Sequence, residues 1–267
     1  LGTVVAIGSQ VDNAKIGDIV TGYYGWSEFV CVPAKGLTIL SPPPGATELD
    51  FMGVLGMTGL TAYFGLFDVG QLKAGETLVV SGAAGATGSV VCQLGKIVGA
   101  KVIAIAGSDD KCKWLEEELG VDKAINYKSP NFVRDFKDSV GYLDVYFDNV
   151  GGEILDLCLS RLNKNARIAL CGAISEYNQA KPRGIQNYLT LIGQRAKIQG
   201  FLVMDYAARF GEGQAKLGEW LAAGKLQRRF HLENGLKDAP QYLNELFNGK
   251  NTGKMIVRVS AKPSSRL

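Results

Sequence analysis

The sequence predicts an α/β fold, with a doubly wound parallel sheet covered by helices on both faces and a smaller β-rich region before it. From Thr77 onward, apolar strand patterns alternate with helical patterns, which is typical of parallel sheets with helical crossovers. Residues 1–40 instead show short β-like runs separated by Gly, Asp and Asn, a pattern that indicates antiparallel or barrel-like pairing. At 267 residues and 46% hydrophobic content, the chain has room for one large or two ordinary domains.

The first region is expected to contain three short strands and one linking helix. The β-like runs are residues 2–7, 19–22 and 27–32. Three prolines and a glycine at 42–45 then end this pattern, and residues 48–67 are apolar enough to form one buried helix between the two regions.

The second region is expected to alternate strands and helices. The predicted strands are residues 78–81, 101–106, 143–148, 166–171 and 196–203. The predicted helices are residues 88–98, 111–119, a helix from 153 onward, and residues 207–223. A final helix at 239–247 and a strand at 254–260 are expected to return to the first region.

A glycine-containing turn, Ser81 to Gly88, follows the first of these strands directly and opens a helix. Its spacing is A-x-G-x-x-G, with Ala83 in place of the usual first glycine. Gly85 would let the backbone approach a diphosphate, Gly88 would permit close helix packing, and the helix N-terminus would offer free N–H groups to the anion. A plain tight turn is the alternative, but the order of strand, turn, helix and strand favours a dinucleotide site.

The end of the second predicted strand indicates which dinucleotide binds. Proteins that prefer NAD place an Asp or Glu there, whereas this chain has neutral residues at 106–108 and then Lys111. The ammonium of Lys111 can contact a 2′-phosphate, so we expect NADPH. The alternative is that Asp109 and Asp110 are helix N-caps and that Lys111 is merely solvated.

Charge and cysteine usage exclude several classes of protein. The 29 Lys and Arg residues are scattered and nearly balanced by 26 Asp and Glu, so neither a nucleic-acid surface nor an anionic membrane surface is expected. The stretch 77–95 is uncharged, but Ser, Thr, Gln and Gly interrupt it, so we do not expect it to span a membrane. Five cysteines without a C-x-x-C pair favour a reducing, intracellular setting. Separately, Leu1 lies inside an apolar run, so we expect that the N-terminus is truncated.

A metal centre is not expected. A catalytic zinc needs three side-chain ligands, usually including a histidine, but His231 is the one histidine and no cysteine cluster accompanies it. We interpret His231 as a surface or packed residue. A segment before Leu1 could still supply metal ligands.

Several motifs together resemble one known family. They are the turn at 81–88, the runs at 107–111 and 126–128, the Asp-Asn-Val-Gly-Gly run at 148–152, and the Cys-Gly-Ala-Ile-Ser run at 171–175. Residues 56–62 also look like the interdomain helix of that family. The chain resembles the zinc-independent medium-chain dehydrogenase/reductases, in the branch of the prostaglandin reductases and alkenal double-bond reductases, from about Gly17 to Val259.

The resemblance implies a Rossmann domain with NADPH in the cleft beside a GroES-like catalytic domain. It implies a partial GroES-like domain at 1–55, the nucleotide-binding domain at 56–225, and a C-terminal segment at 226–267 that returns to the catalytic domain. The implied cofactor residues are Gly85, Ala86, Thr87, Gly88, Lys111, Tyr127, Asn149, Cys171, Gly172, Ala173, Ile174, Ser175, Phe201, Leu202, Val203 and Asn251. Taken singly, Tyr127 could be a core aromatic, and Asn149 and Asn251 could be turn residues. We further expect a cytoplasmic homodimer.

Without a Lewis acid, conjugate reduction of an enal or enone is better supported than oxidation of a plain alcohol. Hydride would add to the β-carbon and charge would build on the carbonyl oxygen, where a hydrogen-bond donor stabilises it. Tyr177 is the candidate donor, and a packed loop aromatic is the alternative. Tyr177 and Lys181 also spell the Y-x-x-x-K pair of short-chain dehydrogenases, but the Pro182 and Gly184 that follow indicate a loop rather than one helix.

Two further functions stay open at this point. Quinone reduction uses the same cofactor with a differently shaped pocket, and a catalytically silent protein could bind NADPH without turnover. Trp26, Tyr24 and Met57 could line a substrate pocket, but aromatic and Met residues are more often part of a core.

Overall fold

A six-stranded parallel sheet organises the part of the chain that the computed structural model describes, residues 1–260. Its strands are β4 (Thr77–Val80), β5 (Lys101–Ala106), β6 (Lys123–Asn126), β7 (Leu143–Asp148), β8 (Leu162–Leu170) and β9 (Lys197–Gly200). Their order in space is β6-β5-β4-β7-β8-β9, and every neighbouring pair is parallel. The predicted doubly wound sheet is therefore confirmed, and its switch point lies between β4 and β7.

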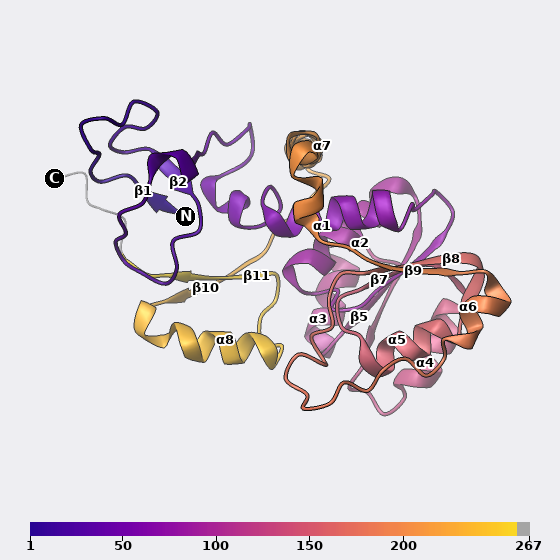
Figure 1. The fold of residues 1–267 in the computed structure, drawn as a ribbon. Helices are drawn as coiled ribbons and strands as arrows, with labels where there is room; N and C mark the ends of the chain where they lie inside the picture. The colour runs from indigo at the N-terminus through magenta and orange to yellow at the C-terminus, as the bar shows by residue number, and fades with distance from the viewer. Residues whose placement is uncertain (261–267) are drawn as a thin grey trace.

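Helices cover both faces of the sheet, as Figure 1 shows. They are α1 (Met57–Phe64), α2 (Ala86–Val98), α3 (Asp109–Glu117), α4 (Phe132–Val140), α5 (Gly152–Leu159), α6 (Leu189–Gln194) and α7 (Phe210–Ala222). Side chains alternate across each strand, so Val80 joins the core cluster under α1, α2, α3 and α7, while its neighbour Val79 joins the cluster under α4 and α5. Because both faces are buried, the central strands are apolar almost throughout.

The N-terminal region forms a small antiparallel sheet. Strands β1 (Gly2–Thr3), β2 (Ile19–Thr21) and β3 (Thr38–Ile39) pair in that order, with the 3-10 turn η1 (Ala34–Gly36) before β3. The antiparallel prediction is confirmed for these strands. The predicted strand at 27–32 was wrong, since those residues form bends and loop, and Phe29 among them is exposed.

The single helix expected at 48–67 was also wrong. The chain forms the 3-10 helix η2 (Glu48–Met52), turns, and then continues as α1 and the π-helical turn η3 (Gly65–Val69). A side chain at Gly56 would overlap the Phe51 carbonyl, and one at Gly59 would overlap the Val54 carbonyl. Glycine at these two positions permits the backbone approach that breaks the helix.

The C-terminal segment forms its own β-α-β unit beside the N-terminal region (Figure 1). Strands β10 (Phe230–Asn234) and β11 (Lys254–Arg258) are parallel and are joined through η5 (Leu236–Asp238) and α8 (Ala239–Phe247). Arg228 Nε lies 2.7 Å from Oδ1 of Asp50, whose side chain is fully buried, so this segment is tied to the linker at 45–56. The last positions of the expected segment 226–267 lie outside the described residues.

Most other sequence-based boundaries differ by a few residues. The predicted helix at 207–223 begins as the 3-10 helix η4 (Val203–Arg209), and α7 follows it. Strands β3, β6 and β10 and helices α4 and α6 were not predicted. In the described part of the chain, none of the helices combines the length and apolar character that crossing a bilayer would require.

Candidate functional site

The residues predicted to bind the cofactor lie where the six sheet strands end. The glycine turn follows β4, Lys111 follows β5, Tyr127 follows β6, Asn149 follows β7, the 171–175 run follows β8, and residues 201–203 follow β9. In a doubly wound sheet, the carboxyl ends of the parallel strands share one edge, and ligands bind in the crevice beside it. The fold therefore places these predicted residues along one edge of the sheet.

The glycine turn is closed tightly enough to need its glycines. Gly82 has a positive φ of 58°, and a side chain on Gly88 would overlap the Gly82 carbonyl and lie 2.8 Å from Ala83 Cα. Gly85 caps α2 in an extended conformation. The first helical residues, Ala86 to Gly88, have no intrahelical acceptor for their N–H groups, which are oriented to receive an anion.

A C-terminal strap, residues 249–254, lies against this turn. The Gly253 N–H donates to the Ala84 carbonyl at 2.8 Å, and Gly253 forms a parallel bridge with Gly85. Asn251 is buried, and its side-chain amide donates to the Gly253 carbonyl at 2.9 Å. Asn251 thus acts as a turn residue that shapes the strap, and its contact with a cofactor stays a prediction.

Two lysines and a tyrosine are close together beyond the ends of β5 and β6. Lys111 Nζ donates to the Gly249 carbonyl of the strap at 2.6 Å. Burial, with the nearby charge of Lys128, lowers the pKa of Lys111. Lys128 Nζ lies 5.8 Å from the centre of the Tyr127 ring, and that half-exposed ring packs against Gly107. Tyr127 is therefore not the core aromatic considered above.

Ser108, not Asp109 or Asp110, caps α3, since its side chain accepts from the Lys111 N–H. The two aspartates lie in the first helical turn, and Asp109 accepts a hydrogen bond from the Asn126 side chain at 2.8 Å. The N-cap interpretation of the aspartates was therefore wrong. Sequence reasoning also missed Lys128, although it belongs to the motif at 126–128 that suggested the family.

Two loops after β7 and β8 are joined by main-chain hydrogen bonds. The Asp148 carbonyl accepts from the N–H groups of Cys171 and Gly172, at 2.8 and 3.1 Å. The Asn149 carbonyl accepts from the Ile174 N–H at 3.3 Å, and the Val150 carbonyl accepts from the Ser175 N–H at 3.1 Å. Asn149 and the 171–175 run therefore form one continuous wall.

The 201–203 run borders the same edge with one ring fixed in the core. The Phe201 ring meets Phe147 edge-on, with centroids 6.2 Å apart, and packs over Gly65, where a side chain would overlap it. Leu202 is 70% exposed, so it is available to a ligand, and Val203 begins η4.

Tyr177 lies in the loop after the wall, and its hydroxyl folds back over it. The hydroxyl oxygen accepts the Ala173 N–H at 3.0 Å and lies next to Gly172, while the side chain as a whole is 60% exposed. Because the oxygen accepts here, its proton is free to be donated elsewhere. Tyr177 and Lys181 lie in this non-helical loop, and Lys181 is exposed. They therefore do not form the Tyr–Lys pair that short-chain dehydrogenases carry on one helix.

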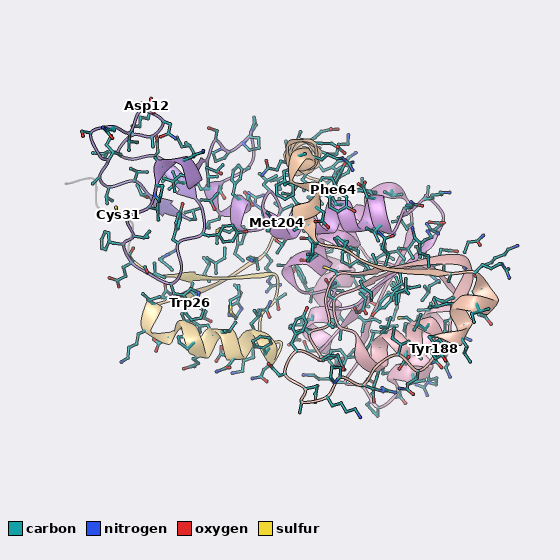
Figure 2. The ribbon with its side chains drawn as sticks, viewed as in Figure 1. Asp12, Trp26, Cys31, Phe64, Tyr188 and Met204 are labelled. Atoms are coloured by element: carbon teal, nitrogen blue, oxygen red, sulfur yellow. The ribbon has the colours of Figure 1, made fainter. Side chains whose placement is uncertain are left out.

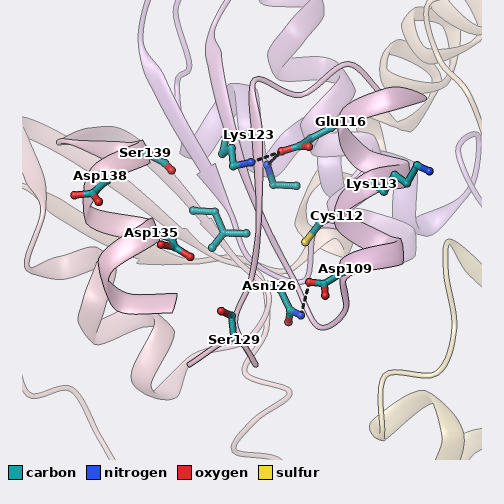
Figure 3. Close-up of a pocket in the computed structure, with 12 residues that line it drawn as sticks. Asp109, Cys112, Lys113, Glu116, Lys123, Asn126, Ser129, Asp135, Asp138 and Ser139 are labelled. Atoms are coloured by element: carbon teal, nitrogen blue, oxygen red, sulfur yellow. Dashed lines mark hydrogen bonds and ion pairs between the residues drawn. The ribbon is translucent and has the colours of Figure 1, made fainter. Parts of the chain in front are cut away.

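A separate hollow opens beside the helix that carries Lys111. It measures about 540 Å³ and lies between α3, α4 and β6, where Figure 3 shows mixed carboxylate and lysine side chains around Cys112. His231 pairs with Glu233 at 2.9 Å in β10 and is partly buried. Among the residues described, no cluster of three or more His, Cys, Asp or Glu side chains is arranged to hold a metal ion.

The sequence and the fold match known proteins over most of the chain. A family described as zinc-binding dehydrogenase matches residues 86–218. YfmJ of Bacillus subtilis (strain 168), whose name assigns it to the NADP-dependent oxidoreductases, is 46% identical over 97% of this chain and 78% of that protein. NADPH-dependent curcumin reductase of Escherichia coli (strain K12) is 39% identical over 94% of this chain and 75% of that protein. The NADP-dependent 2-alkenal reductase of Nicotiana tabacum is 38% identical over 91% of this chain and 72% of that protein.

Solved structures with the same fold are similar to this chain over most of its length. CurA from Vibrio vulnificus, crystallised in complex with NADPH, superposes with a TM-score of 0.87 at 40% identity, over 92% of this chain and 75% of that one. A quinone oxidoreductase from Pseudomonas syringae pv. Tomato DC3000 superposes with a TM-score of 0.77 at 27% identity, over 96% of this chain and 79% of that one.

The burial of Cys171 generates a prediction about thiol reactivity. Burial, with the charge of Asp148 nearby, raises the pKa of Cys171 to about 12. Since only the thiolate is nucleophilic, about one Cys171 in 10⁵ is reactive at pH 7, and that fraction rises about tenfold with each pH unit below 12. With iodoacetamide at pH 7, we expect Cys31, which is exposed, to be alkylated first and Cys171 to stay unmodified, as read by peptide mass spectrometry.

A urea-denatured sample, in which all five thiols should react, is the control. Labelling of native Cys171 as fast as Cys31 at pH 7 would show that the wall at 171–175 opens to solvent.

Proposed function

The chain belongs to the zinc-independent, NADPH-dependent medium-chain dehydrogenase/reductases, and from that premise we propose that it reduces the carbon–carbon double bond of α,β-unsaturated aldehydes and ketones. Two relatives of nearly 40% identity support this substrate class, because they are named as a curcumin reductase and a 2-alkenal reductase. The observation that carries the proposal is the Tyr177 hydroxyl, whose oxygen is held by the Ala173 N–H beside the wall at 171–175.

The predicted cofactor residues follow successive strands of the sheet, and each group would contact a different part of the cofactor. We propose that Gly85, Ala86, Thr87 and Gly88 hold the diphosphate, supported by the free N–H groups of α2. Lys111, Tyr127 and Lys128 would surround the 2′-phosphate, and Asn149 the ribose. The runs 171–175 and 201–203 would flank the nicotinamide, and Asn251 would support the diphosphate end through the strap.

Bound NADPH supplies the hydride, and the protein has to stabilise the charge that moves onto the substrate oxygen. The Tyr177 proton is available for this, since the hydroxyl oxygen accepts the Ala173 N–H and does not need to donate to it. The exposed Leu202 lies at the same edge and would exclude water from the apolar part of the substrate.

We propose the domain division that the resemblance implied. Residues 1–55 would be the partial catalytic domain, 56–225 the nucleotide-binding domain, and 226–267 the returning segment. The ion pair between Arg228 and Asp50 supports the return, because it joins the start of that segment to the end of the first.

Quinone reduction is the second candidate function. The quinone oxidoreductase from Pseudomonas syringae shares the fold at 27% identity, and its name gives that substrate class. A catalytically silent NADPH-binding protein is the remaining alternative.

A panel of acceptors separates these functions. We expect NADPH oxidation, followed at 340 nm, to be fast with enals and enones and slow with para-quinones and with saturated aldehydes of the same length. Faster turnover of quinones than of every enone would select the second function. Tight NADPH binding with no oxidation by any acceptor would select the silent protein.

Replacement of Lys111 should separate the two nicotinamide cofactors. Lys111→Ala removes an ammonium from the proposed 2′-phosphate position, so the Kd for NADPH should rise about tenfold or more, while the Kd for NADH changes less than about twofold. Fluorescence titration of both nucleotides measures this.

Lys113→Ala is the matched control. Lys113 lies on the same helix, is exposed, and only approaches Glu117 at 4.0 Å, so neither Kd should change. An equal loss of NADPH and NADH affinity in Lys111→Ala would remove Lys111 from the proposed site.

Replacement of Tyr177 should affect turnover rather than cofactor affinity. In Tyr177→Phe, we expect kcat with an enone to fall about a hundredfold, the usual effect of losing one donor to a developing oxyanion, while the NADPH Kd stays within about twofold. Tyr188→Phe is the control, since Tyr188 is also exposed but lies at the far end of the loop, near α6 (Figure 2). Unchanged turnover in Tyr177→Phe would assign this side chain to packing.

A further inference from the structure

A buried carboxyl group at the end of β7 organises the crevice but belongs to none of the predicted binding residues. Asp148 is fully buried, and its Oδ1 accepts four hydrogen bonds. The donors are the hydroxyls of Tyr146 and Ser81, at 2.7 and 2.8 Å, and the N–H groups of Val150 and Gly151, at 2.9 and 3.0 Å. Four donors on one oxygen hold this strand end in one geometry, because a shift of any donor away from that oxygen would leave a buried N–H or O–H group without an acceptor.

Ser81 connects this carboxyl group to the neighbouring loop. Its hydroxyl donates to Asp148 and also accepts the Asn149 N–H, at 3.0 Å. Its main-chain carbonyl accepts the Asn149 side-chain amide at 2.7 Å. Residue 149 is therefore held to Ser81 through both its main chain and its side chain.

The contacts continue from this loop into the next one. The Asn149 and Val150 carbonyls accept the N–H groups of Ile174 and Ser175, and the Ser175 hydroxyl donates to the Val150 carbonyl at 2.7 Å. A shift of residues 149 and 150 would therefore move the 171–175 run, which also carries the Ala173 N–H that holds Tyr177.

We propose that Ser81 is a positioning residue for the cofactor. Its hydroxyl joins buried Asp148 to the main-chain N–H of Asn149, and it thereby positions the loops after β7 and β8 that would flank the cofactor. The inference rests on the proposed assignment of residues 149 and 171–175 to the cofactor site. It gives the first residue of the glycine turn a role separate from the turn itself.

The test compares two hydroxyl deletions on the same oxygen. Ser81→Ala and Tyr146→Phe each remove one hydroxyl donor to Asp148 Oδ1, but only the serine hydroxyl contacts Asn149. Both variants should melt at a lower temperature than the wild type. The NADPH Kd, measured by fluorescence titration without substrate, should rise on the order of tenfold in Ser81→Ala and stay within about twofold in Tyr146→Phe.

A second variant covers the case in which Ser81→Ala fails to fold. Ser81→Cys keeps the shape of the side chain but offers a weak donor and a weak acceptor, so its NADPH Kd should rise by about threefold or more. Equal changes of Kd in Ser81→Ala and Tyr146→Phe would reduce Ser81 to a structural residue. A wild-type Kd in both serine variants would overturn the proposal.

The measurement of the NADPH Kd does not depend on which substrate the protein reduces. If the wild type binds NADPH but reduces no enone, the proposed reaction fails while the comparison of Ser81 and Tyr146 can still be made. If enones are reduced and the serine variants bind NADPH normally, the positioning role fails alone.

Discussion

The pairing of β4 with β7 is the contact on which the crevice depends. It brings Ser81 and Asn149, which are far apart in the sequence, to adjacent strand ends, where the Asn149 amide donates to the Ser81 carbonyl at 2.7 Å. The chain leaves β4 through α2 on one face and leaves β7 through α5 on the other, which is the arrangement at which doubly wound sheets bind ligands. A strand order in which β4 and β7 were not neighbours would separate the glycine turn from Asn149.

The strap at 249–254 adds a second constraint, because it contacts both the glycine turn and Lys111. Gly253 bridges Gly85, while the Gly249 carbonyl accepts from Lys111. Gly253 has a φ of 73°, and a side chain there would overlap the Arg229 carbonyl, so this close approach requires glycine. The C-terminal segment, which could be read from sequence only as a helix and a strand, therefore helps to shape the proposed diphosphate site.

Local patterns predicted the parts of the fold that local physics decides. The strands β5 and β7 and the helix α8 were predicted with their observed bounds. The two strands are apolar runs that burial selects, whereas α8 buries only Ala239. The edge strand β6 is four residues long and begins with an exposed lysine, so it carries too little periodicity to be recognised. The helix expected at 48–67 was broken by backbone contacts at Gly56 and Gly59, which depend on how the chain folds back and not on composition. The same limit hid Asp148 and Ser81, whose roles exist only once β4 and β7 are neighbours.

Under the proposed assignment of Lys111 and Lys128 to the 2′-phosphate, their charges would favour the phosphorylated cofactor in a nearly neutral protein. Lys111 is partly buried and lies close enough to Lys128 that burial and this second ammonium lower its pKa, so the two cations destabilise each other when no anion is present. A phosphate placed between them removes that repulsion and raises the pKa of Lys111 again, which links binding to proton uptake wherever Lys111 is partly deprotonated. The Gly249 carbonyl offers only a dipole and cannot provide the same compensation. Under this proposed assignment, selectivity for the 2′-phosphate would arise because a phosphate compensates both the burial of Lys111, which is the larger cause of its lowered pKa, and the repulsion from Lys128.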